Sequence, residues 1–137
     1  MNILFICSGN SVRSQIAEGW TRRLAADGLG VTSAGLRALG VHPRAVATMR
    51  QAGIDISDHG SRTIDDALLH WADHIVTLCD SVKPFAAVFP QTATHHHWSI
   101  PDPDKSRQGE SAEDAYDRVR DQIRILVEQL IQELQGR

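Results

Sequence analysis

A cysteine and an arginine separated by five residues stand near the start of the chain, in the stretch C-S-G-N-S-V-R-S that runs from Cys7 to Ser14. Small residues let such a loop curl so that its backbone N–H groups point inward and hold an anion. Arg13 adds a planar guanidinium that can bond two oxyanion oxygens at once. The spacing therefore predicts a loop that binds a phosphate-like oxyanion.

The same positive groups favour the thiolate form of Cys7. A free thiol has a pKa of about 8.5, and helix N-termini and nearby cations stabilise the thiolate. We expect Cys7 to attack the bound anion as a nucleophile, with Ser14 donating a hydrogen bond to its sulfur and Asn10 holding the loop through its side chain. The residues predicted to surround the substrate are those of the loop itself: Ser8, Gly9, Asn10, Ser11, Val12, Arg13 and Ser14.

Short apolar runs alternate with helical patterns along the chain, which predicts an α/β fold with a parallel sheet covered on both faces. Strands are expected at residues 2–7, 31–34, 74–79 and 95–100, and helices at 13–26, 42–53, 64–73 and from 111 onward. Ligands in such sheets bind beyond the carboxyl ends of the strands. The pattern therefore predicts that the carboxyl-terminal edge of the sheet carries Cys7, Cys79 and Ile100.

The bulk composition limits the other possibilities. The 137 residues, 42% of them hydrophobic, suit a single domain over 1–137. A net charge of −3 gives no basic field for nucleic acid or membranes. The sequence has no apolar run of about 18 residues and no signal-peptide pattern, so we expect a cytoplasmic location. We also expect a monomer. Two cysteines do not form a disulfide scaffold.

The chain resembles the low-molecular-weight protein tyrosine phosphatase superfamily and, within it, the thiol-coupled arsenate reductases. The motifs that carry the resemblance are C-S-G-N-S-V-R-S-Q-I-A-E-G, T-S-A-G, V-H-P-R-A-V-A-T-M, G-I-D-I-S, V-T-L-C, H-H-W-S-I-P-D-P and Y-D-R-V-R-D-Q-I. The resemblance implies a four-stranded, three-layer fold with strand order 2-1-3-4. It also implies Cys7 as the nucleophile, Arg13 as the oxyanion clamp and Asp102 as the acid.

Asp102 follows the fourth predicted strand, at the predicted catalytic edge, where a carboxylic acid can protonate a leaving oxygen. The alternative is an ordinary turn aspartate before Pro103, with Asp104 as a neighbouring competitor. Phosphatases of the family usually carry an aromatic residue directly after the Asp-Pro pair, where this chain has Asp104. That departure weakens the tyrosine phosphatase interpretation.

The role of Cys79 depends on the resemblance, which implies a thiol that releases arsenite from Cys7 and leaves a disulfide. The alternative is a buried structural cysteine. Many thioredoxin-coupled members have a further cysteine several residues later, and this chain has none. We therefore expect an external thiol as reductant: thioredoxin or glutaredoxin acting on a Cys7–Cys79 disulfide, or a small thiol such as glutathione or mycothiol attacking the arsenylated Cys7.

No bound cofactor or metal is expected. On a strand, only His95 and His97 of the three consecutive histidines share a face, and no partner set has zinc spacing. Some members of the family hold a monovalent cation behind the loop, where Asn10, Glu18, Ser33 and Asp65 would line it.

Three hypotheses follow. The leading one is an arsenate reductase that forms an arsenylated Cys7. The second is a phosphatase that forms a phosphocysteine, and it uses the same Cys7, Arg13 and Asp102. The third is a binding module that no longer turns over, and the intact set of reactive residues argues against it.

Overall fold

The computed structural model describes residues 1–105 and 107–136, and its centre is a parallel sheet of four strands. The strands are β1 (Asn2–Cys7), β2 (Gly30–Gly35), β3 (His74–Thr77) and β4 (Thr94–His97). They are arranged in the order β2-β1-β3-β4, which confirms the predicted fold class and strand order.

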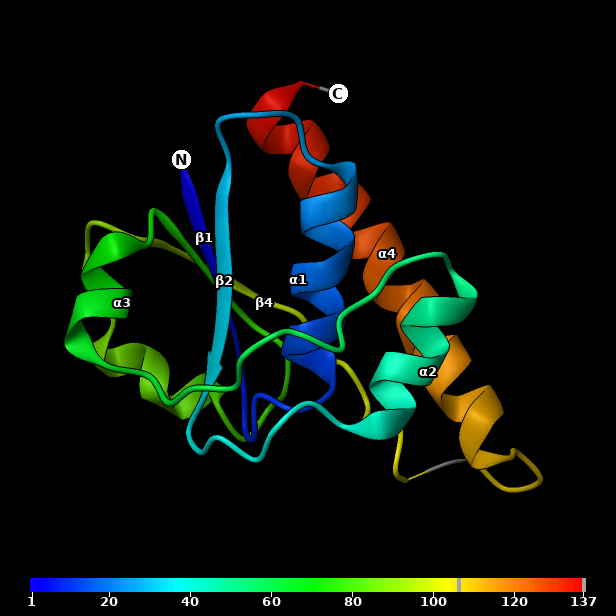
Figure 1. The fold of residues 1–137 in the computed structure, drawn as a ribbon. Helices are drawn as coiled ribbons and strands as arrows, with labels where there is room; N and C mark the ends of the chain where they lie inside the picture. Colours follow the sequence, from blue (N-terminus) through cyan, green and yellow to red (C-terminus); the bar gives the residue numbers. More distant parts are fainter. Residues whose placement is uncertain (106, 137) are drawn as a thin grey trace.

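Helices cover both faces of this sheet (Figure 1). On one side lie α1 (Arg13–Leu24), α2 (Pro43–Gln51) and the long α4 (Ala112–Gln135); on the other lie α3 (Asp66–Trp71) and the 3-10 helix η1 (Lys83–Val88). The strands all point the same way, so the turns that follow β1, β3 and β4 meet at one edge.

Two strands end earlier than the sequence pattern predicts. β3 stops at Thr77 rather than at residue 79, and β4 covers Thr94–His97 rather than 95–100. Single backbone hydrogen bonds still continue the pairing, from Trp98 N to Thr77 O and from Leu78 N to Ile6 O. Apolar residues therefore extend past the regular strands, which is why periodicity alone placed the ends too late.

The core is built on β1, where Ile3, Leu4, Phe5 and Ile6 are completely buried. Burial of one such side chain contributes about 1.5–3 kcal/mol to folding. α4 adds a stripe of buried residues on its inner face, including Val119, Ile123 and Val127. Cys7 thus stands at the end of the most deeply buried strand, on a rigid base.

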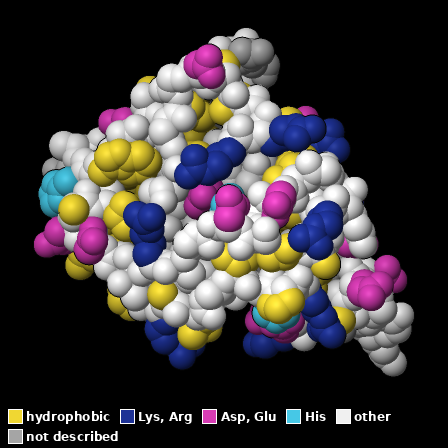
Figure 2. Space-filling model, viewed as in Figure 1, with side chains coloured by type: hydrophobic (Ala, Val, Ile, Leu, Met, Phe, Trp, Pro, Cys, Tyr) yellow, Lys and Arg dark blue, Asp and Glu magenta, His cyan; other side chains and the backbone are white. Residues whose placement is uncertain are grey.

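The surface carries charges of both signs, interspersed on the face shown in Figure 2. Within residues 1–105 and 107–136, no helix combines the length and the apolar character that a membrane crossing requires.

The segment between β4 and α4 is tied to α4 near its start. Ser111 caps the helix by accepting a hydrogen bond from Asp114 N. Just before it, Glu110 accepts two hydrogen bonds from the Arg118 guanidinium, at 2.9 and 3.0 Å. The Arg118 hydrogen bonds, helped by one from Arg107 N, lower the pKa of Glu110 from 4.5 to about 2.

We predict that Glu110→Gln destabilises the fold in a pH-dependent way. A carboxyl whose pKa is lower in the folded protein stabilises it above the unfolded-state pKa. That contribution is lost as pH falls from 4.5 towards about 2. Urea unfolding of both proteins over this range should show a stability difference that shrinks as the pH is lowered. A difference that stays constant with pH would contradict the assignment.

Candidate active site

The loop between β1 and α1 is held open by the segment that follows β2. Three backbone N–H groups of that segment donate to loop carbonyls at 3.0 Å each: Arg37 to Ser8, Leu39 to Gly9 and His42 to Ser11. In a trans peptide the N–H points away from the carbonyl. Because the carbonyls of Ser8, Gly9 and Ser11 point outward, the N–H groups of Gly9, Asn10 and Val12 point to the inside of the loop. An anion-binding nest requires this arrangement.

Asn10 organises the loop from behind. It is completely buried, and its φ of 46° lies in the left-handed region, which asparagine tolerates better than most residues. Its Nδ2 donates to Ser14 Oγ and to Ser33 Oγ, at 2.9 Å each. Its Oδ1 accepts from Arg62 N at 2.9 Å. One side chain thus joins the loop, α1, β2 and the strand-like segment at residue 62.

The end of β2 must approach this loop closely. A Cβ atom added to Gly35 would lie 2.6 Å from Asn10 N and 3.0 Å from Cys7 O, and both are backbone atoms that cannot give way. Glycine is therefore required there, which gives the T-S-A-G motif a physical reason.

The Cys7 sulfur lies 2.9 Å from Ser14 Oγ. Because Ser14 Oγ already accepts a hydrogen bond from Asn10, its own proton is free to be donated to the sulfur. Ser14 lies in the first turn of α1, so this contact holds the Cys7 sulfur at the N-terminal end of that helix.

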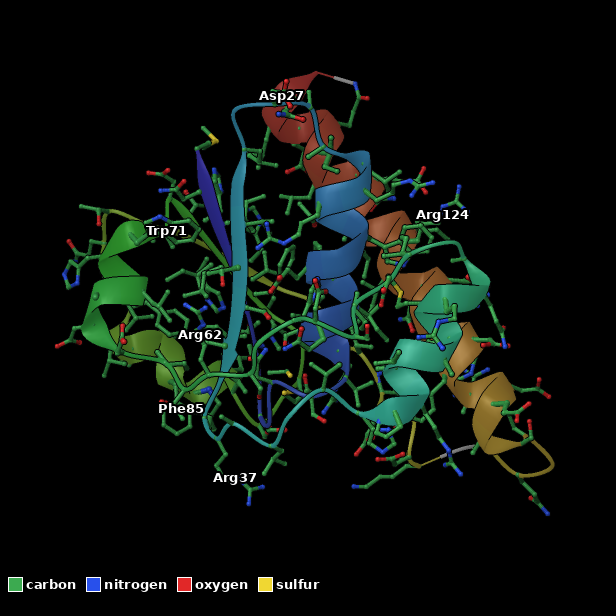
Figure 3. All side chains as sticks on the ribbon, in the orientation of Figure 1. Asp27, Arg37, Arg62, Trp71, Phe85 and Arg124 are labelled. Carbon is green, nitrogen blue, oxygen red and sulfur yellow. The ribbon has the colours of Figure 1, made fainter. Side chains whose placement is uncertain are left out.

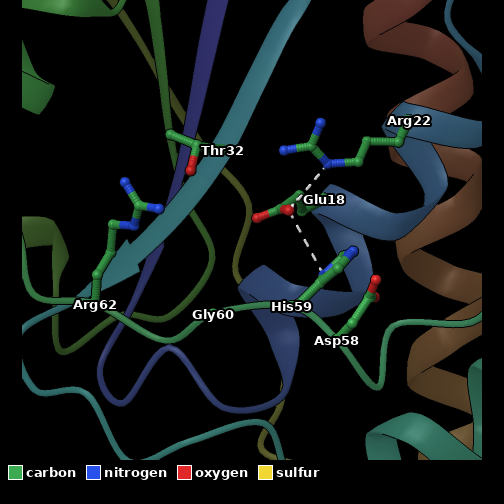
Figure 4. Close-up of a pocket in the computed structure, with 7 residues that line it drawn as sticks. All are labelled: Glu18, Arg22, Thr32, Asp58, His59, Gly60 and Arg62. Atoms are coloured by element: carbon green, nitrogen blue, oxygen red, sulfur yellow. Dashed lines mark hydrogen bonds and ion pairs between the residues drawn. The ribbon is translucent and has the colours of Figure 1, made fainter.

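A buried carboxylate completes the support of the loop (Figure 4). Ser33 Oγ donates to Glu18 Oε1 at 2.7 Å, while Glu18 Oε2 pairs with Arg22 at 3.0 Å and lies 3.5 Å from His59 Nδ1. Of the four side chains expected to line a monovalent-cation site, only three are joined to one another by hydrogen bonds. Asn10, Ser33 and Glu18 are hydrogen-bonded in a row, whereas the Asp65 side chain caps α3 by accepting from Leu68 N.

In front of the loop is a pocket of about 180 Å³. Its lining brings the predicted nucleophile, clamp and acid together with four predicted loop residues and with Asp104, and it adds Leu39 and His42, which the sequence did not single out. The full lining is Cys7, Ser8, Gly9, Ser11, Val12, Arg13, Leu39, His42, Asp102 and Asp104. The side chains of Asn10 and Ser14, which belong to the set predicted to surround the substrate, support the loop from behind. Leu39 and His42 reach the pocket only through the long loop after β2, which no motif placed there.

Arg13 is oriented by the exit of β4. Its NH1 donates to Ile100 O at 2.9 Å, directly before the Pro101–Asp102 turn. The guanidinium therefore links the anion loop to the segment that carries the candidate acid.

Cys79 lies in a neighbouring hollow of about 460 Å³ rather than in the pocket of Cys7. The two cavities share Ser8, Arg13 and Asp102 as a common wall. Cys79 is 4% exposed and receives a hydrogen bond from Ser81 Oγ at 3.6 Å. The next residue, Asp80, is tied to the β4 side of the sheet by His97 Nε2 and Ser99 Oγ, at 2.8 Å each. These two hydrogen bonds lower the pKa of Asp80.

Figure 3 shows Phe85, from η1, and Arg37 at the end of the molecule towards which β2 points. Phe85 and Val88 are exposed, at 46% and 69%.

The side chains of the three consecutive histidines bond to residues of β3. His95 and His97 both hydrogen-bond Thr77, and His96 pairs with His74 on the other face, as the strand alternation predicts. In the described parts of the chain, no three His, Cys, Asp or Glu side chains are grouped so that they could hold a metal ion.

Comparison with known proteins identifies relatives over most of the chain. A family model described as low molecular weight phosphotyrosine protein phosphatase matches residues 2–137. Arsenate reductase 2 of Staphylococcus epidermidis is 41% identical over 126 residues, 92% of each chain. An arsenate reductase of Bacillus licheniformis is 44% identical over 122 residues, 88% of each chain.

Solved structures agree with these matches. An arsenate reductase in its phosphate-binding state is 35% identical, with a TM-score of 0.78 over 96% of this chain and 97% of that one. The YwlE arginine phosphatase of Geobacillus stearothermophilus is 25% identical, with a TM-score of 0.85 over 98% of this chain and 93% of that one.

We predict that Cys7 reacts as a thiolate and that Ser14 helps to stabilise it. Alkylation by iodoacetamide should be fast at neutral pH, where most free cysteine is protonated. Ser14→Ala should slow it about tenfold in mildly acidic solution, because a hydrogen bond to a charged group contributes about 1.5–3 kcal/mol. Cys79→Ser serves as the background, so that only Cys7 is alkylated. If Ser14→Ala, made in this background, shows the same pH dependence of the alkylation rate as Cys79→Ser alone, the hydrogen bond from Ser14 has no such role.

Proposed function

The chain belongs to the low molecular weight phosphotyrosine protein phosphatase family, and from this premise we propose that it is an arsenate reductase. The observation that supports this most directly is a pocket that combines Cys7, Arg13 and Asp102. Relatives at 41% and 44% identity are named arsenate reductases.

In the first step arsenate occupies the nest of N–H groups, with two oxygens on the Arg13 guanidinium. The Cys7 thiolate attacks arsenic, so that a sulfur–arsenic bond forms. One arsenic–oxygen bond breaks, and Asp102 supplies the proton with which that oxygen leaves as water.

The second step is reduction. We propose that the Cys79 thiolate attacks the Cys7 sulfur, which forms a disulfide. The electron pair of the sulfur–arsenic bond passes to arsenic, which leaves as arsenite. Arsenic gains two electrons and the two thiols lose them. An external thiol or dithiol then reduces the disulfide, which returns both cysteines to the starting state.

The position of Cys79 imposes a condition on this step. Its hollow shares a wall with the pocket of Cys7, but the sulfurs line different cavities. The Cys79–Ser81 segment must shift across the common wall, which requires the hydrogen bonds of Asp80 to His97 and Ser99 to loosen.

Hydrolysis of a phosphate ester is the second candidate function, because it needs the same three residues for a phosphocysteine. The pocket favours it less. Among the described residues that line the pocket there is no Phe, Tyr or Trp to grip a phosphotyrosine ring, and Asp104 stands where the family's phosphatases have an aromatic.

One experiment separates the two functions. Arsenate is supplied with thioredoxin, glutaredoxin or small-thiol systems coupled to NADPH oxidation, and p-nitrophenyl phosphate is supplied in parallel. We expect arsenate-dependent NADPH use by the wild type and none by Cys7→Ser or Cys79→Ser. Phosphate release should survive in Cys79→Ser, which serves as the matched control for the fold.

Two results would change this assignment. Phosphate release without arsenate-dependent NADPH use in any system would reject the reductase. Arsenate reduction that is lost in Cys7→Ser but retained in Cys79→Ser would assign the second step to direct attack by the external thiol instead of Cys79.

A further inference from the structure

A second carboxyl group stands beside the candidate acid. Asp104 lines the same pocket as Asp102, and its backbone N–H donates to Asp102 Oδ1 at 2.9 Å. Lys105 N donates to Asp102 O at 3.0 Å and closes the turn. The bond from Asp104 N restrains the rotation of the Asp102 carboxyl, and the bond from Lys105 N fixes the backbone of the turn. The position of Asp102 therefore depends on where Asp104 is held.

Asp104 is held by a tyrosine of α4. The Tyr116 hydroxyl donates to Asp104 Oδ1 at 2.6 Å, a short hydrogen bond of the kind made to carboxylates. Tyr116 is 1% exposed and lies in the second turn of a helix whose start is capped by Ser111. The anchor of the Asp102–Lys105 turn is thus a rigid, buried side chain.

Tyr116 also contacts the other side of the pocket. Its ring lies 5.5 Å, centroid to centroid, from that of His42. His42 lines the pocket, its backbone N–H donates to Ser11 O in the anion loop, and its Nδ1 accepts from Arg44 N. One buried aromatic residue therefore touches both the segment that shapes the anion loop and the turn that carries the acid.

The electrostatics favour this arrangement. The carboxylate of Asp104 beside the pocket repels an oxyanion, and the hydroxyl of Tyr116 offsets part of that charge. Burial raises the pKa of Tyr116, and the Asp104 hydrogen bond and the charges of Asp104 and Asp102 raise it further. Tyr116 therefore remains a protonated donor at every pH at which the enzyme would work.

We infer that Tyr116 is a positioning residue, which holds Asp102 over the anion loop through its hydrogen bond to Asp104. The inference rests on the proposed function, because it assigns Tyr116 a part in the step in which Asp102 donates its proton. Tyr116 itself does not line the pocket of Cys7, so it acts through Asp104 and does not bind the substrate.

The chain offers a matched control one residue along the same helix. Thr48 Oγ1 donates to Asp117 Oδ1 at 2.5 Å, another hydroxyl-to-carboxylate bond between α4 and a neighbouring element. Neither residue lines the pocket of Cys7. Thr48→Val removes this bond with little change of shape, as Tyr116→Phe removes the other.

We expect Tyr116→Phe to lower kcat for arsenate reduction about tenfold while KM changes less than about twofold, because substrate binding is left intact. Thr48→Val should leave both constants unchanged. Asp104→Asn keeps an acceptor oxygen and should retain most activity, whereas Asp104→Ala should match Tyr116→Phe. The double variant Tyr116→Phe with Asp104→Ala should be no slower than either single one, because both remove the same bond.

A second readout separates positioning of the acid from general damage. Phenyl phosphate has a poorer leaving group than p-nitrophenyl phosphate and depends more on a proton donor. Tyr116→Phe should therefore slow phenyl phosphate hydrolysis about tenfold and p-nitrophenyl phosphate hydrolysis only slightly. An equal loss on both esters would indicate a structural role and overturn the inference.

Amide hydrogen exchange tests the same contact without any activity. In Tyr116→Phe the N–H groups of Asp104 and Lys105 should exchange about tenfold faster than in the wild type or Thr48→Val. The inference would be overturned if Tyr116→Phe left the exchange of these two amides or kcat unchanged. It would also be overturned if the losses in kcat of the two single variants multiplied in the double variant. A wild type that fails to reduce arsenate would count against the proposed function alone, since exchange still decides the role of Tyr116.

Discussion

The site depends on the buried amide of Asn10. Its two N–H bonds and its carbonyl are all used, and they connect the anion loop to Ser14, Ser33 and the backbone at Arg62. A buried polar group without partners costs about 1–3 kcal/mol, so each of these bonds helps to fix the left-handed backbone at position 10. The direction of the Ser14 hydrogen bond, the shape of the nest and the orientation of the Cys7 sulfur all follow from it.

Two reactive segments are fitted around this fixed loop. Asp102 reaches it on a turn held by α4, and Arg13 bonds the backbone just before that turn. Cys79 reaches it from the end of β3, in a separate hollow with a shared wall. The first half of the proposed reaction therefore uses parts that are already assembled, while the second half requires a movement.

The sequence predicted much of this because the relevant signals are local. The strand–helix alternation predicted the parallel sheet, and the family resemblance implied the strand order that the structure confirms. The sequence also indicated that Asn10 holds the loop and that Ser14 meets the sulfur, and the structure shows both contacts.

What the sequence did not predict comes from contacts between distant segments. Leu39 and His42 line the pocket because the loop after β2 folds over the anion loop, a tertiary event with no local pattern. The Tyr116–Asp104 bond joins residues on different segments, and its two partners look like an ordinary helix residue and a turn aspartate. The placement of Cys79 in its own hollow depends on where β3 ends, and apolar residues past Thr77 concealed that end.

If Asn10 organises the loop in advance to hold a tetrahedral oxyanion, its loss must weaken the binding of inorganic phosphate, which calorimetric titration measures. We expect the wild type and Cys7→Ser each to bind one phosphate with similar affinity. We expect Asn10→Ala, checked by circular dichroism to be folded, to bind phosphate at least about tenfold more weakly. Phosphate binding by folded Asn10→Ala as tight as that of the wild type would contradict it.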